Sequence, residues 1–356
     1  MDVHWCDPNQ GYTLASCGDD GTVRIWEERK LSSSHRKSSS GTTTSVATTT
    51  FVEAATLKLC DSPLTAVKWA SATLITTTLN RAITGSSAML AASSSDGNVY
   101  IIESKSVHGI QDADIALSTC AGRGEPGTEP SLFPREWSVS HVFKATGLTN
   151  STTTIVDRRR ADPVTCLCWR PALASSNLGS GDSEYATGAA SLLLVTGSVR
   201  SKAKVWAYRP HQMRWVESAI IGEGGGGGGE GQKHVSEDGN HRSGAVTAVS
   251  WAPRLAQPSE ILAIAWGATS SEDSQVWLVS LEGEADRLHA KVLHRLTHQS
   301  DVCSIQWDAL GMDFAVSLEN GAIVMWELRL DGNWHRKATE VTVEKLRAEV
   351  AETAAT

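Results

Sequence analysis

Three histidines, His289, His294 and His298, stand close together and carry a side chain that often binds transition metals. Their spacing approaches that of metal ligands on one face of a helix. A zinc site also draws on cysteine or carboxylate ligands, and neither type sits with these histidines. The surrounding segment has the pattern of strand, loop and strand. The sequence therefore predicts no metal site here.

Cys166 and Cys168 form a second candidate for chemistry, because a Cys-x-Cys spacing can hold a metal or a redox pair. Alternate residues of a strand point to the same face, so two thiols in an apolar strand also pack together into one layer. We predict this structural burial. The chain has seven cysteines, an odd number, and most stand in apolar runs. This usage is typical of reduced thiols in the cytosol or nucleus.

Recognisable catalytic and cofactor motifs are missing from the sequence. The glycine run 224–229 is not followed by Gly-Lys-Ser/Thr, so it lacks the signature of a phosphate-binding loop. Asn150-Ser151-Thr152 is a glycosylation sequon, but no secretory signal accompanies it. Nucleophile elbows, zinc-binding helices and dinucleotide fingerprints do not occur. We predict a non-enzymatic protein without catalytic residues, cofactor or metal.

The charge and hydropathy of the chain argue against nucleic acid and the membrane interior as its partners. The net charge of −8 argues against direct nucleic-acid binding, which needs clustered lysines and arginines. The tight basic run Arg158-Arg159-Arg160 is expected in a solvated loop. No apolar run reaches the roughly 18 residues of a membrane-spanning helix. Binding to another protein is the simplest remaining role.

The elements that position these residues belong to a repeated unit. Its opening copy, LASCGDDGTVRIWEE over Leu14–Glu28, is an apolar strand, an Asp-Gly turn and a strand closing on Trp. Five copies carry variants of the pattern V-x-x-V-x-W, an apolar run, and V-x-I-W, whose alternation predicts strands that bury one face. Tryptophan recurs at the same positions of the repeat, at the ends of strands, so we interpret these side chains as packing between repeats. The tryptophans concerned are Trp5, Trp26, Trp69, Trp169, Trp206, Trp251, Trp277, Trp307 and Trp326.

Turn residues separate the last two strands of three copies. They are Asp20-Gly21, Asp96-Gly97 and Asn320-Gly321. These dipeptides favour a two-residue type I′ hairpin, which requires a positive φ at both positions. The two other copies carry longer polar loops at this point.

A three-stranded unit cannot cover its own apolar faces, whereas several arranged radially can. Repeats of roughly 40–45 residues with four short strands are typical of WD-repeat β-propellers. We therefore predict an all-β WD-repeat β-propeller with five visible blades in a single domain over residues 1–340. Polar segments 31–50, 104–134 and 222–243 are expected to be flexible loops. The tail 341–356 forms either a short amphipathic helix on Val343, Leu346 and Val350 or a disordered end.

Several stretches resemble the SEH-type nucleoporins and the related SEC-thirteen coat proteins. LASCGDDGTVRIWEE is similar to the second blade of that family, and EWSVSHVF, residues 136–143, to an outer strand of the SEH branch. VSWAPRLAQPSEILAIA (249–265) resembles the fifth SEH blade, and LDGNWHRKA (330–338) the segment after the last blade. SSDGNVYIIE (94–103) is closer to SEC-thirteen. Trp137 and Ile261–Ala265 favour the SEH branch.

The resemblance implies a six-bladed open propeller whose seventh blade is supplied by an α-solenoid scaffold nucleoporin. Such an opening is expected to expose sheet edges that accept added strands. The implied role is that of a scaffold in the Y-shaped outer ring of the nuclear pore complex at the nuclear envelope. The SEH branch also joins GATOR/SEA-type nutrient-signalling complexes at lysosomal or vacuolar membranes. The alternatives are a SEC-thirteen-like vesicle coat and a generic WD-repeat adaptor.

The sequence departs from the family pattern at its start, because a first blade should precede Val3. Either a segment of about 40–45 residues is missing upstream, or the first blade is lost. We expect the former, since Met1-Asp2 begins inside an inner strand. In either case five repeats are visible.

Overall fold

The computed structural model describes residues 2–6, 12–31, 48–71, 86–106, 135–145, 162–171, 192–200, 202–222, 244–253, 259–269, 272–285, 287–337 and 341–342. Most of the three predicted loops lies outside these residues, as do the sequon, the basic run, the glycine run and the predicted tail helix. The assignment of residues 1–340 to a single domain stays a prediction.

The described residues form five antiparallel sheets, each built from strands consecutive in the chain. We number these sheets as blades I to V. Blade I contains β1 (Asp2–Trp5), β2 (Thr13–Cys17), β3 (Thr22–Leu31) and β4 (Thr48–Lys58). Blade II contains β5 (Leu64–Trp69), β6 (Ser86–Ser94), β7 (Asn98–Ser106) and β8 (Arg135–Lys144).

The remaining blades repeat this order. Blade III contains β9 (Val164–Trp169), β10 (Leu193–Ser198), β11 (Ala203–Arg209) and β12 (Arg214–Ile221), with a short 3-10 helix, Pro210–Gln212, before β12. Blade IV contains β13 (Val246–Trp251), β14 (Glu260–Trp266), β15 (Ser274–Glu284) and β16 (Arg287–His298). Blade V contains β17 (Val302–Trp307), β18 (Asp313–Leu318), β19 (Ala322–Leu328) and β20 (Trp334–Arg336), and β21 (Val341–Thr342) also pairs with β19.

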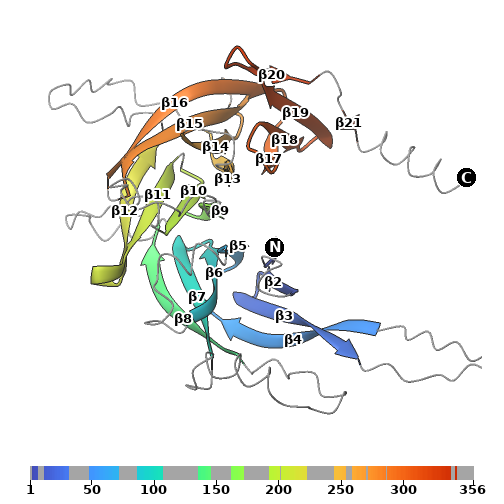
Figure 1. Ribbon diagram of the computed structural model, residues 1–356, viewed down its shortest axis with the longest axis vertical. Coiled ribbons are helices and arrows are strands. Elements are labelled where there is room, and N and C mark those ends of the chain that lie inside the picture. Colours follow the sequence, from blue (N-terminus) through green and yellow to red (C-terminus); the bar gives the residue numbers. More distant parts are fainter. Residues whose placement is uncertain are drawn as a thin grey trace, which may run out of the picture.

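Figure 1 shows the blades arranged around a common centre, with β5, β9, β13 and β17 innermost and β4, β8, β12 and β16 at the rim. The ring is not closed, because an opening separates blade V, in red, from blade I, in blue. This is the all-β WD-repeat propeller that the repeats predict, with five blades in the described part of the chain.

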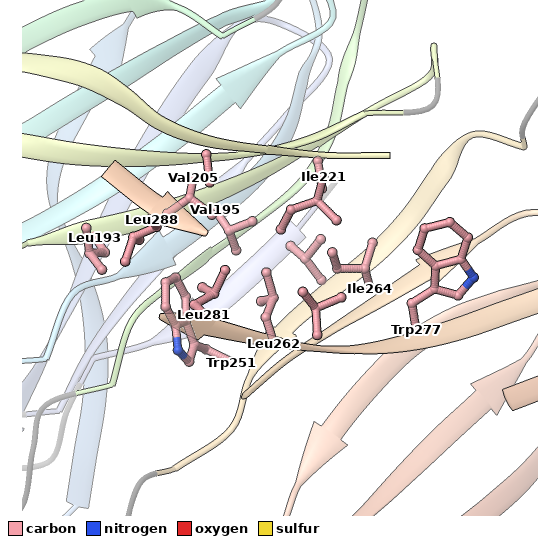
Figure 2. Close-up of a cluster of buried hydrophobic side chains, with 14 of the residues drawn as sticks. Leu193, Val195, Val205, Ile221, Trp251, Leu262, Ile264, Trp277, Leu281 and Leu288 are labelled. Carbon is pink, nitrogen blue, oxygen red and sulfur yellow. The ribbon is translucent and has the colours of Figure 1, made fainter. Parts of the chain in front are cut away.

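The core of the described residues consists of four clusters, one at each junction, or seam, between consecutive blades. Alternation along the strands creates them, because each sheet buries one face against the preceding blade and the other against the following one. At the seam of blades III and IV, Val195 and Ile221 of blade III lie in one cluster with Leu262 and Ile264 of blade IV (Figure 2). The other clusters join I to II, II to III and IV to V.

The three predicted hairpin turns form, but the type I′ prediction is wrong. Asp20 does not have a positive φ, since Met213 is the one such non-glycine residue in the described chain. Instead, Gly21 N–H donates to the carbonyl of Gly18, and Gly21 alone takes φ +70°. The Asp20 carboxylate accepts the N–H of Thr22 at 3.1 Å, which stabilises a longer turn ending on a left-handed glycine.

Gly21 should be among the least replaceable turn residues. A Cβ at this position would lie 2.0 Å from the carbonyl oxygen of Cys60, and its φ disfavours any side chain. We expect Gly21→Ala to lower the free energy of unfolding by about 2–4 kcal/mol. Denaturant unfolding measures this loss. Gly332→Ala, where nothing lies within 4 Å of the added carbon and φ is also positive, separates the clash from the backbone strain.

Candidate interaction face

A hydrogen bond recurs at the inner end of three seams. The last residue of an inner strand is a tryptophan, and its indole N–H donates to a backbone carbonyl in the inner strand of the preceding blade. The acceptor is each time the residue just before that strand's own tryptophan. The pairs are Trp69 with His4 at 3.0 Å, Trp169 with Lys68 at 2.9 Å, and Trp307 with Ser250 at 3.2 Å.

The same inner tryptophans also contact an aromatic residue of the outer strand of their own blade, edge to face. The ring centroids are 5.5 Å apart in Trp69–Trp137, 5.7 Å in Trp169–Trp215 and 5.6 Å in Trp307–Trp334. Such T-shaped pairs contribute about 0.5–1.5 kcal/mol beyond the area that they bury. Each pair spans the width of a blade and is covered by the preceding blade.

Blade I carries the same pair, and no other described blade packs against it. Trp5 and Phe51 meet at 5.5 Å with an interplanar angle of 70°. The exposed fraction of Trp5 is 53% and that of Phe51 is 45%, whereas Trp69 and Trp137 are 5% and 7% exposed. Trp5 pairs with Leu14, which pairs with Trp26, so these side chains share one face with Val3. We call Val3, Trp5, Leu14, Trp26 and Phe51 the open face.

The opposite face of β1 holds this strand firmly in position. The Asp2 carboxylate accepts the N–H of Val67 at 3.1 Å and forms an ion pair with Lys68 at 2.9 Å. Nδ1 of His4 accepts the N–H of Trp69 at 3.1 Å. Side chains of β1 thus satisfy backbone donors of β5. The open face is therefore anchored to blade II and presented on a fixed strand.

His4 and His298 make the fold sensitive to acid. Burial, reinforced by Lys68 and opposed by Asp2, lowers the pKa of His4 to about 4, and burial together with Arg336 lowers that of His298 to about 4. Both imidazoles stay neutral in the fold while the unfolded chain binds protons below about pH 6.5. Protonating His4 also removes the acceptor of the Trp69 N–H.

The stability contributed by neutral histidines is therefore complete above about pH 6.5 and is lost as the pH falls toward 4. We expect the midpoint temperature of unfolding to drop across this window. Scanning calorimetry between pH 7 and 4 measures the drop. A double variant, His4→Asn and His298→Asn, should flatten the curve; an unchanged slope would contradict this assignment.

Blade V borders the other side of the opening with smaller and more polar groups. Cys303 is exposed there, and Ala315 pairs with Met325 on partly buried strands. The expectation that the opening exposes sheet edges stays a prediction. β1 and β4 end the sheet of blade I, β20 and β21 pair with β19 within blade V, and blades I and V also turn a sheet face toward the opening. A partner can therefore pack against these faces.

The other sequence-predicted residues lie away from the open face. His289, His294 and His298 are spread along β16, and buried His298 contacts the ring of Trp326 at 5.8 Å. The described residues contain no group of three or more potential metal ligands. Cys166 and Cys168 pack against the III/IV cluster, and burial raises the pKa of the Cys166 thiol to about 12.

The predicted tryptophans divide by position. Most are buried in seams, Trp26 and Trp326 are half-buried, and Trp5 is exposed. The sequence analysis did not identify a further position that recurs in the repeats, an aromatic residue in the outer strand. The residues at this position are Phe51, Trp137, Trp215 and Trp334. The sequence does indicate this position, because each of these aromatic residues follows the third strand of its repeat.

Comparisons with known proteins agree with this architecture. Residues 2–27, which span β1 to most of β3, match the family model described as WD domain, G-beta repeat. Protein SEH1 of Arabidopsis thaliana is 28% identical over 141 residues, 39% of this chain and 37% of the relative. The SEC13 homolog of Drosophila melanogaster is 27% identical over 143 residues, 40% of this chain and 33% of the relative.

A longer match covers nearly all of the blades. Protein transport protein SEC13-2 of Candida glabrata is 21% identical over 333 residues, 93% of this chain and 78% of that protein. The chain is similar to WD-repeat proteins of the SEH/SEC13 type. The chain spans about a third of the length of the first two relatives, so their identity covers only part of each molecule. Among its described residues, no helix is long and apolar enough to cross a membrane.

Proposed function

We propose that this protein is a non-catalytic scaffold subunit of the outer ring of the nuclear pore complex, supporting transport of protein and mRNA. The observation that carries the proposal is the open face, which has the aromatic pair of a blade seam and which no blade among the described residues covers. An apolar surface of this kind marks a site of protein association. The SEH1 and SEC13 relatives support a scaffold at the level of the family.

The partner that we propose is an α-solenoid scaffold nucleoporin that completes the propeller. Blades I and V present sheet faces to the opening, and a sheet packs on a sheet at roughly 10 Å. A β-sheet contributed by the partner fits such faces better than a bare helix. Binding would bury Trp5 and Phe51, whose large rings are typical anchors of protein interfaces.

Isolation of the tagged full chain from its own cells tests this function. We expect outer-ring nucleoporins to co-purify and a fluorescent fusion to mark the nuclear rim. Recovery of vesicle-coat subunits without any nucleoporin would overturn the pore assignment. Phe51→Ser and Val3→Ser, two substitutions on exposed positions, should reduce recovery of the partner while leaving the midpoint of unfolding close to that of the parent chain.

A vesicle-coat role is the second candidate. The match to the protein transport protein SEC13-2, which extends over 93% of this chain, favours it. It predicts puncta near the nucleus and co-purification with coat subunits. Membership of a GATOR/SEA-type complex stays a prediction, and the relatives give no support for a lysosomal or vacuolar location.

A further inference from the structure

The outer strand of blade II, β8, has a side-chain pattern that is symmetric about its midpoint. Four of its residues pair with alternate residues of β7 and therefore lie on one face, the face toward blade I. They are Trp137, Val139, Val142 and Lys144. A β-bulge causes the wider step in the middle, because the register with β7 passes over Ser140. The pattern therefore reads the same in both directions along the strand.

The middle of β8 also lacks the charges that protect exposed sheet edges. Natural edge strands often carry charged residues, which disfavour pairing with another chain. Residues 137–143 contain no Asp, Glu, Lys or Arg. The outer strands β4, β12 and β16 carry Glu53, Glu217 and Lys291 at or near their midpoints. Any of these three strands paired with its own copy would bring like charges together, whereas β8 would not.

The outer edge of β8 is available for pairing in the described part of the chain. Figure 1 shows β8 at the rim of the ring, and among the described residues it pairs with β7 alone. A strand paired on one side offers backbone N–H and C=O groups to a further strand. Two apolar side chains stand exposed along this strand, since Val139 is 40% exposed and Val142 is 55% exposed. A second strand placed here would cover both of them.

We propose that two copies of this chain pair through β8, antiparallel, about a two-fold axis that passes between Ser140 and His141. In this register Val139 of each copy lies opposite Val142 of the other. Opposed residues then stand on the same face, as a continuous sheet requires. Ser140 of each copy lies opposite His141 of the other, so both bulges fall at the centre and the pairs on either side keep their register.

Charge complementarity favours a second copy of this chain over an unrelated strand. In the proposed register Lys144 lies opposite Trp137 of the second copy, one residue from its Glu136. Glu136 and Lys144 are both exposed and form no ion pair with another described residue. The two-fold axis places this contact between opposite charges at both ends of the strand pair. A two-fold interface needs a self-complementary surface, and the symmetric pattern of β8 provides one.

The dimer is independent of the proposed scaffold function. The open face belongs to blade I and shares no residue with β8, so each surface can be tested without the other. One strand pair is at the low end of interface sizes, and we therefore expect a transient dimer.

Sedimentation velocity of the purified full chain from about 1 to 100 μM measures the association. We expect the sedimentation coefficient of the parent chain to rise with concentration. Val142→Lys should raise the dissociation constant about tenfold, because its ammonium group would be desolvated beside Val139 of the second copy. Val139→Lys should have the same effect and serves as an independent second variant. Both substitutions stand at exposed positions, so the midpoint of unfolding should stay that of the parent.

Val292→Lys is the matched control, since Val292 is 37% exposed and lies on another outer strand, β16. Its dissociation constant should stay within about twofold of that of the parent chain. A parent chain that remains monomeric throughout, or an effect of Val292→Lys equal to that of Val142→Lys, would overturn the proposal.

Disulfide formation between two differently tagged chains tests the register. One chain carries Val139→Cys and the other Val142→Cys, both with Cys303→Ser to remove an exposed thiol. Directly opposed residues of antiparallel strands have Cα atoms about 4.5–5.5 Å apart, which suits a disulfide. The same position in the two copies is a diagonal neighbour at about 7–8 Å, which does not.

We therefore expect the mixture of the two chains to form a covalent dimer about threefold to tenfold faster than either chain alone. Mass spectrometry of the dimer should identify position 139 joined to position 142. Equal rates in the mixture and in the separate chains, or no covalent dimer, would overturn the proposed pairing of β8.

Discussion

Glu260→Ala should lower the free energy of unfolding by about 3–5 kcal/mol, because it removes the carboxylate that forms an ion pair with the buried Arg170 guanidinium. Arg170 follows β9 of blade III and Glu260 begins β14 of blade IV, with Nη2 and Oε1 3.3 Å apart. Their side chains are 2% and 13% exposed. Water can replace little of the lost interaction at such a site. Denaturant unfolding followed by circular dichroism measures the change.

A double variant shows whether charge or packing causes the loss. Arg170→Met combined with Glu260→Leu removes both charges and keeps most of the volume, and buried ion pairs replaced in this way are often neutral or gain stability. We expect it to recover most of the stability lost in Glu260→Ala. Equal destabilisation in the single and double variants would show that shape, and not the loss of the ion pair, matters at this seam.

Trp215→Ala should also destabilise the fold by about 3–5 kcal/mol. Trp215 lies at the seam of blades II and III, where its ring contacts Trp169 at 5.7 Å, Tyr208 at 5.5 Å and Phe143 of the preceding blade at 5.7 Å. Removing the indole opens a cavity among rings on both sides of the seam. Calorimetry should show a lower midpoint of unfolding and a smaller enthalpy.

Phe51→Ala is the matched control, because Phe51 has the same place in blade I. Its ring contacts Trp5 but is 45% exposed, so little apolar area returns to water on truncation. We expect Phe51→Ala to lower the free energy of unfolding by less than about 1 kcal/mol and to weaken binding of the proposed partner. A loss as large as that of Trp215→Ala would mean that the open face is covered within the free chain.

The sequence by itself determined the blades. Alternating apolar residues specify strands that bury both faces, and the recurrence of V-x-x-V-x-W with a following apolar run specifies five similar sheets. The dipeptide Asp20-Gly21 placed a hairpin correctly, because glycine is needed where φ is positive. Its turn type was predicted wrongly, since the Asp20 carboxylate accepts the Thr22 N–H and stabilises a longer turn.

Only the tertiary structure decided which tryptophan is a packing residue and which is exposed. Trp5 and Trp69 occupy the same slot in their repeats, so their local sequences predict the same burial. Their exposed fractions differ, 53% against 5%, because blade I covers Trp69 and no blade covers Trp5 in the described chain. A tryptophan at a seam is buried only when a neighbouring blade covers it. Whether such a blade is present depends on where the repeat stands in the ring, and the residues of the repeat itself do not determine this.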